Sequence, residues 1–473
     1  MVIIMKTDTI AAISTAVTDS GIGIIRVSGE DAISIVHSVF VNKKNEKCLD
    51  SYKSHTIHYG FIIDENETMI DEVMVSIMKA PNSYTTEDTV EINCHGGVFM
   101  MKKIMDIVLS AGARTAQPGE FTKRAFLSGR IDLSKAEAVM DIINSKNEFA
   151  LKSSVKQLKG SVSEIVKDLR EKILYEIAFI ESALDDPEHI SLDDYPEKLY
   201  KKNEEIISRL KKLLDSADDG RILKEGINTV IVGKPNAGKS SLLNILVGEE
   251  KAIVTEIAGT TRDILEETIF LDGITLNITD TAGIRNTDDV VEKIGVKRAK
   301  KAVEESDLAV YMIDASIPLD ENDFDIMKMI KDKKTIILLN KSDLDSFVSE
   351  DNLAHTLSDI DKDFSHDNIK IIKTSTKENE GIDSFTDTIK EMFFHGELSY
   401  SDEIYITNIR HKESMKNAYD SMMQVQKSIE ENMPEDFYSI DLMSAYASLG
   451  EIIGEEIGED LVNEIFSKFC MGK

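Results

Sequence analysis

Hydrophobic residues in the first part of the chain alternate with polar ones in short runs, a pattern that is typical of β-strands. Four such runs stand out, at residues 23–27, 55–63, 73–78 and 89–94. Turn-forming residues separate the runs, and only one convincing helical pattern interrupts them, at 98–111. The pattern therefore predicts an α+β domain at the start of the chain.

From residue 134 to about 214 the apolar residues follow the three-and-four spacing of amphipathic helices. Leu151, Val155 and Leu158 belong to one such stripe. The same spacing returns after residue 401, so two helical segments flank the middle of the chain. We expect these two segments to pack on each other as one helical domain.

Between the helical segments, residues 220–382 alternate β-like runs with helical ones, which is the signature of a doubly wound, mostly parallel sheet. The expected strands are 228–232, 266–271, 275–279, 308–313, 335–339 and 368–373. The sequence thus predicts a multidomain protein of α/β and α+β class, with the α/β domain inserted into the helical one. The predicted domains are residues 1–125, 126–219, 220–390 and 391–473.

Length and charge narrow the classes of function. The 473 residues suffice for about three domains. A formal net charge of −31 argues against broad electrostatic binding to nucleic acid, so RNA contacts should be local or supplied by a partner. The three cysteines lack zinc-type spacing, which favours a reducing compartment. No apolar run reaches the ~18 residues of a membrane span, and we expect a cytoplasmic protein without membrane contact.

The most specific motif is a phosphate-binding loop, Gly233-Lys-Pro-Asn-Ala-Gly-Lys-Ser240. It joins the apolar run at 227–232 to a predicted helix. Gly233 and Gly238 let the backbone curl around a phosphate chain, and amides at the helix start point toward anionic oxygen. We expect Lys239 to reach the β- and γ-phosphates and the Ser240 hydroxyl to hold Mg²⁺.

Three further motifs follow at the ends of predicted strands. In Asp280-Thr-Ala-Gly283 the carboxylate can hold Mg²⁺ through water, and the last amide can sense the γ-phosphate. In Asn340-Lys-Ser-Asp343 the final carboxylate can accept from two donors of guanine that adenine does not offer together. Ser375-Thr-Lys377 is placed to touch the base. The order of these motifs predicts a G domain that binds GTP.

The means of hydrolysis is less obvious. Ile284 follows the Asp-x-x-Gly motif, where small G proteins carry the Gln that orients the attacking water. Asn236 offers a side-chain oxygen for a monovalent cation, or is simply a turn residue. Glu292 could act on water, or be an exposed helix charge. The segment 254–262 could complete a cation cage with backbone carbonyls, with Thr261 closing on Mg²⁺.

Two charges in the first domain interrupt strand-like runs. Arg26 lies in Gly-Ile-Ile-Arg-Val-Ser-Gly, and Glu91 lies in Glu-Ile-Asn-Cys-His-Gly-Gly. Each is either a ligand contact or a solvated residue on the outer face of a sheet. The local pattern leaves both interpretations open.

Over essentially its whole length the chain resembles the MnmE (TrmE) family of tRNA-modifying GTPases. The resemblance rests on the blocks at 118–126, 235–241, 256–263 and 280–285 and on the end Phe-Cys-Met-Gly-Lys at 469–473. The G motifs alone do not separate this family from other translation-associated G proteins, whereas the N-terminal block and the tail do. The family tail usually reads Cys-Ile-Gly-Lys, so Met471 is an apolar replacement of similar size.

The resemblance implies a K⁺-dependent Ras-like G domain and an N-terminal domain that dimerises and binds a one-carbon tetrahydrofolate, in the 5-formyl or 5,10-methylene form. The implied folate contacts are Arg26, Glu91, Arg130 and Lys473. The implied K⁺ ligands are Asn236, Thr255, Ile257 and Thr260, and the Mg²⁺ ligands are Ser240 and Thr261. Glu292 would position or activate water, and Cys470 is either a residue of the modification chemistry or a small apolar residue.

The motifs and the resemblance together predict the GTP contacts. These are Asn236, Ala237, Gly238, Lys239, Ser240, Ser241, Thr255, Glu256, Ile257, Ala258, Gly259, Thr260, Thr261, Asp280, Thr281, Ala282, Gly283, Asn340, Lys341, Asp343, Ser375, Thr376 and Lys377.

The resemblance also implies a homodimer and a partner similar to MnmG (GidA), which carries FAD, uses NADH and joins a heterotetramer or larger complex. Such a pair installs an aminomethyl or carboxymethylaminomethyl group at C5 of the wobble uridine of tRNA. The alternative is a G-protein switch in ribosome or RNA assembly without modification chemistry. The tail and the N-terminal pocket residues favour the first interpretation, because a switch alone would not need them.

Overall fold

The computed structural model describes residues 8–248, 266–280, 300–360, 368–394, 406–470 and 472, and the structural statements below refer to these. Contacts between residues divide the chain into two compact units. The first comprises Met1–Ile143, Lys156–Asn203 and Asp420–Lys473, and the second comprises Asn144–Val155 and Glu204–Tyr419. The domain boundaries given above remain predictions.

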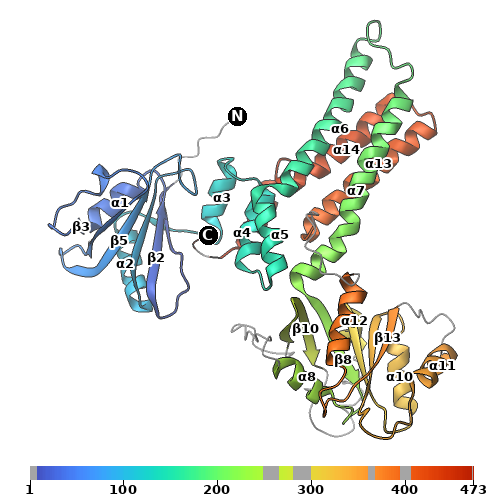
Figure 1. Ribbon diagram of the computed structural model, residues 1–473. Helices are drawn as coiled ribbons and strands as arrows, with labels where there is room; N and C mark the ends of the chain where they lie inside the picture. The colour runs from blue at the N-terminus through green and yellow to red at the C-terminus, as the bar shows by residue number, and fades with distance from the viewer. Residues whose placement is uncertain are drawn as a thin grey trace. The chain divides into compact units, whose positions relative to one another are not determined.

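The first unit begins with a seven-stranded sheet in the order β3-β4-β5-β6-β2-β1-β7 (Figure 1). Neighbouring strands are antiparallel except β1 and β7, which are parallel. Helices α1 and α2 cover one face, over a core that includes Ile25, Val75 and Ile92. The bounds are β1 Ile10–Ile13, β2 Ser20–Ser28, α1 Ala32–Val39, β3 Phe40–Asn42, η1 Leu49–Ser51, β4 Thr56–Ile63, β5 Met69–Met78, β6 Thr89–Gly96, α2 Val98–Ser110 and β7 Arg114–Thr115.

The prediction of a single helix before residue 130 was wrong, because α1 and α3 (Glu120–Leu127) form as well. Both are only eight residues long, which is about two turns, so neither shows a full amphipathic period in the sequence.

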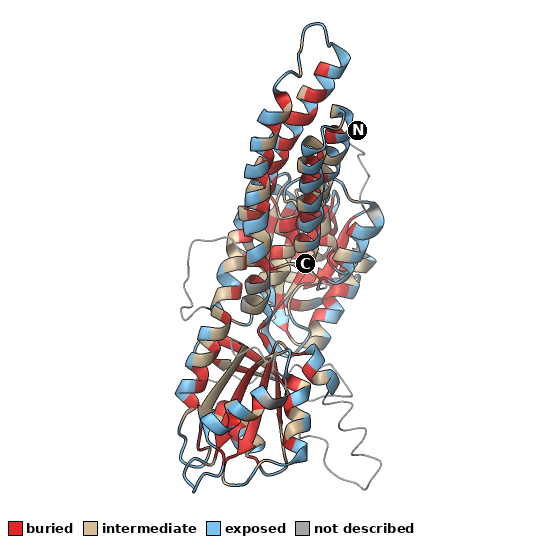
Figure 2. Cartoon of the chain, turned by 90° about the vertical axis from the view of Figure 1, so that its right-hand side faces the viewer, coloured by how far each residue is buried: buried red, intermediate tan, exposed pale blue. Residues whose placement is uncertain are grey.

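Helices make up the rest of the first unit, and α5, α7 and α13 contribute residues to both units. Buried and exposed residues form stripes along the long helices (Figure 2). α6 packs along α14, and Asn203 of α7 donates its Nδ2 to the carbonyl of Met422 in α13 at 2.9 Å. The two helical segments therefore pack together, as predicted. Among the described residues, no helix has the length and apolar character needed to cross a bilayer. The bounds are α4 Leu133–Ile143, α5 Glu148–Lys159, α6 Ser161–Asp185, α7 Tyr195–Glu225, α13 Ile409–Glu430, α14 Glu435–Ile453 and α15 Glu459–Ser467.

The second unit contains a six-stranded sheet in the order β13-β12-β11-β8-β10-β9. Its pairs are parallel except β9 with β10. One apolar cluster joins the sheet to α8 and α12, and another joins it to α10 and α11, so helices cover both faces. The predicted doubly wound, mostly parallel sheet is confirmed. The bounds are β8 Ile227–Gly233, α8 Lys239–Gly248, β9 Glu266–Leu271, β10 Ile274–Asp280, β11 Leu308–Asp314, α10 Glu321–Ile330, β12 Lys334–Asn340, α11 Glu350–Ile360, β13 Ile369–Lys373 and α12 Ile382–Phe394.

Candidate functional site

The loop between β8 and α8 has the backbone shape of a phosphate cradle. Gly238 has a φ of +109°, and a Cβ there would lie 2.2 Å from Nδ2 of Asn340, so only glycine fits. Asn236 adopts a φ of +63° and is exposed at the loop surface. Ser240 and Ser241, in the first turn of α8, are exposed as well. The loop residues therefore fit a bound phosphate chain with Mg²⁺ at the helix start.

The loop lysine is held by the start of the loop. Nζ of Lys239 donates to the carbonyl oxygens of Gly233 and Lys234, both at 2.7 Å. An ammonium has three N–H donors, and these two bonds fix where it lies in the cradle. Lys239 is thus aligned by backbone atoms of its own loop.

The motif that is predicted to select guanine is hydrogen-bonded to the phosphate loop. Asn340 donates from Nδ2 to the carbonyl of Ala237 at 2.8 Å, and its Oδ1 accepts from the amide of Thr376 at 3.0 Å. The Ser375 hydroxyl donates to Oδ1 of Asp343 at 2.8 Å and lowers the pKa of that carboxyl. The predicted base contacts at 340–343 and 375–377 therefore meet beside the loop, and the ionised form of Asp343 is favoured, as the predicted role of guanine acceptor requires.

Two lysines complete this side of the site. Nζ of Lys377 lies 3.7 Å from Oδ2 of Asp343. Lys341, with a φ of +66°, donates to Oδ2 of Asp314, which is buried at the end of β11. Burial would raise the pKa of Asp314, but the bonds from Lys341 and Ser316 outweigh it and lower the pKa. The pair fixes the lysine of the guanine motif.

Several predicted site residues lie outside the described part of the chain. These are Thr255, Glu256, Ile257, Ala258, Gly259, Thr260, Thr261, Thr281, Ala282, Gly283, Glu292 and Lys473. Asp280 is the last residue of β10, but its side chain is not described. The predicted K⁺ cage, the second Mg²⁺ ligand and the water-activating carboxylate therefore stay predictions.

In the first unit, Arg26 and Glu91 face each other across β2 and β6 in register. Nε of Arg26 lies 2.8 Å from Oε1 of Glu91, so the two charges that interrupt the strand patterns form an ion pair with each other. A second donor of Arg26, NH1, reaches the carbonyl oxygen of Gly472 at 3.1 Å, and the Ser14 hydroxyl reaches the same oxygen at 3.2 Å. Gly472 of the C-terminal tail therefore lies beside two of the predicted folate contacts.

A tyrosine links the third predicted folate contact to this group. The guanidinium carbons of Arg26 and Arg130 lie 5.7 and 5.1 Å from the centroid of the Tyr84 ring. NH1 of Arg130 also donates to the carbonyl of Tyr84 at 3.0 Å. Cations over an aromatic face are attracted by the ring quadrupole, so Tyr84 orients both guanidinium groups. The cluster presents two cations and one carboxylate, a set suited to an anionic ligand with N–H donors.

The tail docks against the start of α3. The amide of Gly119 donates to the carbonyl of Cys470 at 3.3 Å. Gly119 has a φ of +67°, and a Cβ there would lie 2.6 Å from the carbonyl oxygen of Phe466 and 2.8 Å from Cβ of Phe469. The Cys470 residue itself is exposed and carries a free thiol.

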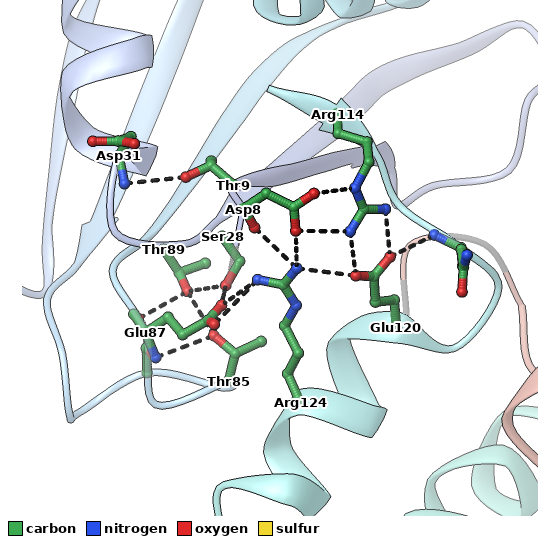
Figure 3. A network of polar contacts seen from close by, with 12 residues as sticks. Asp8, Thr9, Ser28, Asp31, Thr85, Glu87, Thr89, Arg114, Glu120 and Arg124 are labelled. Carbon is green, nitrogen blue, oxygen red and sulfur yellow. Dashed lines mark hydrogen bonds and ion pairs between the residues drawn. The ribbon is translucent and has the colours of Figure 1, made fainter. Parts of the chain in front are cut away.

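Helix α3 is held by a network of ion pairs (Figure 3). The buried Arg124 donates from NH1 to Glu87 and from NH2 to Glu120, and Arg114 pairs with both Glu120 and Asp8. Burial would raise the pKa of Glu120, but its bonds with Arg114, the amide of Gln117 and Arg124 lower it. The network fixes the helix that carries Phe121, whose ring lies 5.6 Å from the Arg26 guanidinium.

Comparisons with known proteins identify the family of the chain. The model for the MnmE helical domain matches residues 133–470, and the one for the GTP-binding protein TrmE N-terminus matches 9–130. The chain belongs to the MnmE (TrmE) family. Among similar MnmE proteins, each called a tRNA modification GTPase, that of Lachnoclostridium phytofermentans is 56% identical, over 99% of this chain and 100% of the relative.

Two further MnmE relatives match over nearly their full length. The protein of Acetivibrio thermocellus is 49% identical, over 99% of this chain and 100% of the relative. That of Clostridioides difficile is 46% identical, over 98% and 99% respectively. The predictions of an MnmE-type chain and of an enzyme of the GTPase class are thereby confirmed.

The sequence analysis missed Tyr84 and Asp314. Neither lies in a motif with its partner, since Tyr84 lies 58 residues from Arg26 and Asp314 lies 27 residues from Lys341. Only the folded sheets bring these pairs together. The spacing of Tyr84 in the sequence does not reveal that its ring lies between Arg26 and Arg130 in the fold.

Proposed function

We propose that this chain is the GTP-hydrolysing component of the machinery that modifies C5 of the wobble uridine in tRNA. The observation that carries the proposal is the pairing of two built sites in one MnmE-family chain. One is a phosphate loop joined to the carboxylate expected to select guanine, and the other is a charged cluster beside which Gly472 of the C-terminal tail lies.

In the G domain, this chain's residues bind and orient GTP. Lys239 contacts the β- and γ-phosphates, Ser240 and Thr261 hold Mg²⁺, and Asp343 accepts from guanine. K⁺, held by Asn236 with Thr255, Ile257 and Thr260, supplies positive charge beside the phosphates. The exposed, left-handed Asn236 supports that role because its side chain is free of the packed core.

Water must be oriented without the usual glutamine, because Ile284 has no polar group. Glu292 is the carboxylate that we assign to this task. It would accept a proton or a hydrogen bond from the attacking water while the loop and the cation stabilise the phosphate charge.

In the N-terminal domain, Arg26, Glu91, Arg130 and Lys473 bind a one-carbon tetrahydrofolate, which supplies the carbon unit for the modification. Arg130 is exposed, and Tyr84 holds its guanidinium at two points, so it is available to a carboxylate of the ligand. The ion pair between Arg26 and Glu91 offers an acceptor and donors side by side. Cys470 lies at the same tail and is the candidate for chemistry beyond binding.

The protein acts in the cytoplasm as a homodimer with an MnmG-like partner that carries FAD and uses NADH. The net charge of −31 supports a division of labour, because tRNA is itself a polyanion. We infer that the partner provides much of the basic surface that holds tRNA. GTP hydrolysis would then gate the modification through the segments that contact the γ-phosphate.

The test is a reconstitution with tRNA, the FAD partner, GTP, K⁺ and a tetrahydrofolate donor. Modified uridine should form with the wild-type chain and fail to form when Lys239 is replaced by alanine. Modification that proceeds equally well without GTP turnover would overturn the proposal.

A further inference from the structure

The second residue of the phosphate loop is anchored outside the loop. Nζ of Lys234 lies 2.7 Å from Oδ2 of Asp323 and 3.0 Å from Oδ2 of Asp320. The lysine side chain is 14% exposed and that of Asp323 only 1%. The pair with Asp323 differs from the usual surface pair, because solvent screens it weakly and its geometry is fixed by neighbours, whereas the Asp320 side chain is 51% exposed.

The carboxylates of Asp320 and Asp323, which pair with Lys234, are themselves held by hydrogen bonds. Oδ1 of Asp323 accepts from the hydroxyl of the buried Tyr311 in β11 at 2.7 Å, and Oδ2 accepts from the amide of Asp320 at 2.9 Å. Asp320 caps α10 by accepting from the amides of Asn322 and Asp323. A strand and a helix start thus fix the two acceptors to which Lys234 is tied.

The anchored residue is also a support of the loop lysine. The carbonyl of Lys234 is one of the two oxygens that accept from Nζ of Lys239, at 2.7 Å. A side chain fixed to α10 holds the Cα of Lys234, and with it the peptide plane that presents this oxygen. Pro235, which follows, restricts the backbone of Lys234 further.

We propose that Lys234, through its bonds to Asp320 and Asp323, is a positioning residue for GTP hydrolysis that sets the place of the Lys239 ammonium. Its own charge is committed to the two carboxylates, so it acts through Lys239 and not by touching phosphate. The proposal concerns the GTPase activity of the chain and does not depend on folate or tRNA.

The chemistry of the anchor agrees with this role. Burial would lower the pKa of Lys234, but the bonds to Asp323 and Asp320 outweigh it and raise the pKa. The ammonium therefore stays protonated at neutral pH, where it can keep its bonds to the two carboxylates.

The test compares three variants of the full-length chain. K234M keeps the aliphatic stem without the ammonium, and K234R keeps a cation that can reach both carboxylates. D320N keeps an oxygen for the helix cap but replaces the other carboxylate oxygen by a donor. K328M is the matched control, since Lys328 lies on the same helix α10 and is 63% exposed.

Turnover is measured per nucleotide site, with sites counted by titration with a fluorescent GDP analogue. Counting sites in this way corrects the measured turnover for any fraction of the protein that is unfolded. We expect K234M to lower kcat about tenfold with a smaller change in KM. The reason is that a misplaced Lys239 ammonium stabilises the transition state, in which charge develops on the phosphates, less well than the bound substrate. D320N should lie between K234M and wild type, whereas K234R and K328M should stay within about threefold of wild type.

Wild-type kcat per site in K234M would overturn the proposal, as would a K234R variant that is impaired as strongly as K234M. If K234M does not fold, D320N decides, and an unchanged kcat in D320N then contradicts the proposal. A failure of the GTPase assignment itself would appear differently, as absence of turnover in the wild-type chain.

Discussion

Replacing Gly119 by alanine should release the C-terminal tail and weaken folate binding. The tail lies against this glycine, whose amide donates to the Cys470 carbonyl at 3.3 Å. The added Cβ would lie 2.6 Å from the Phe466 carbonyl oxygen and 2.8 Å from Cβ of Phe469. A methyl carbon does not approach an oxygen or another carbon that closely, so α3 must move or the tail must move together with the end of α15. Because the ion-pair network around Arg124 holds α3, we expect the tail to move.

The magnitude follows from three terms. A left-handed alanine costs about 1–2 kcal/mol, wherever it occurs. Forcing a methyl group into packed atoms costs ~1–3 kcal/mol more, and the hydrogen bond to Cys470 contributes about 1 kcal/mol. The last two terms act on the docked tail, and ~2–4 kcal/mol corresponds to a 30- to 1,000-fold shift toward the undocked state. The apparent affinity for folate falls once the undocked state predominates, so we expect at least a tenfold weaker Kd.

The assay is calorimetric titration with 5-formyltetrahydrofolate, with GTP turnover measured on the same samples. Gly129 provides the matched control, since its φ is +74° and nothing lies within 4 Å of a Cβ built there. G129A therefore carries the same backbone strain without the clash. We expect G119A to lose folate affinity and keep GTP turnover, while G129A keeps both. Wild-type folate affinity in G119A, or an equal loss in G129A, would refute the reasoning.

Four other outcomes follow from the contacts described or predicted above. Replacing K⁺ by Na⁺ should lower GTP turnover several-fold, and equal rates in both salts would remove Asn236 from the cation role. S375A removes the donor to Asp343, so KM for GTP should rise about tenfold at similar kcat, whereas an unchanged KM would contradict the assigned base contact. R124M should destabilise the first unit by about 3–5 kcal/mol in thermal unfolding, and a loss below ~1 kcal/mol would deny the network its structural role. Because folding lowers the pKa of Glu120, its contribution to stability is fully present above pH ~5 and is lost as pH falls through the folded pKa. E120Q should flatten this acid-induced loss of thermal stability, and an unchanged acid profile would contradict the assignment.

Local sequence pattern determines most of the elements. The predicted runs at 73–78 and 308–313 lie within β5 and β11, and the helix expected at 98–111 is α2. Ala32–Val39 escaped prediction because Ile33, Ile35 and Val39 suit a strand as well as a two-turn helix. The helix is favoured because it buries Ala32, Ile35 and Val36 against the sheet, and this contact cannot be seen in the sequence.

The nucleotide site and the charged cluster around Arg26 differ in how much of each could be predicted from the sequence. The G motifs are contiguous, and each follows a strand, so their meeting at one sheet edge could be predicted. The pairing of Arg26 with Glu91 could not, because it depends on a strand register between residues 65 positions apart. The resemblance to a family supplied those residues instead. The roles of Tyr84, Asp314 and Lys234 appear only in the fold, since each side chain contacts a residue that lies far from it in the sequence.

The most direct test of the account is nucleoside mass spectrometry of tRNA from cells that lack this protein. The account predicts that aminomethyl- and carboxymethylaminomethyluridine at the wobble position disappear, return with the wild-type chain and do not return with K239A. Normal levels of these nucleosides in the deletion strain, or full restoration by K239A, would contradict the central claim that GTP hydrolysis by this chain drives the modification.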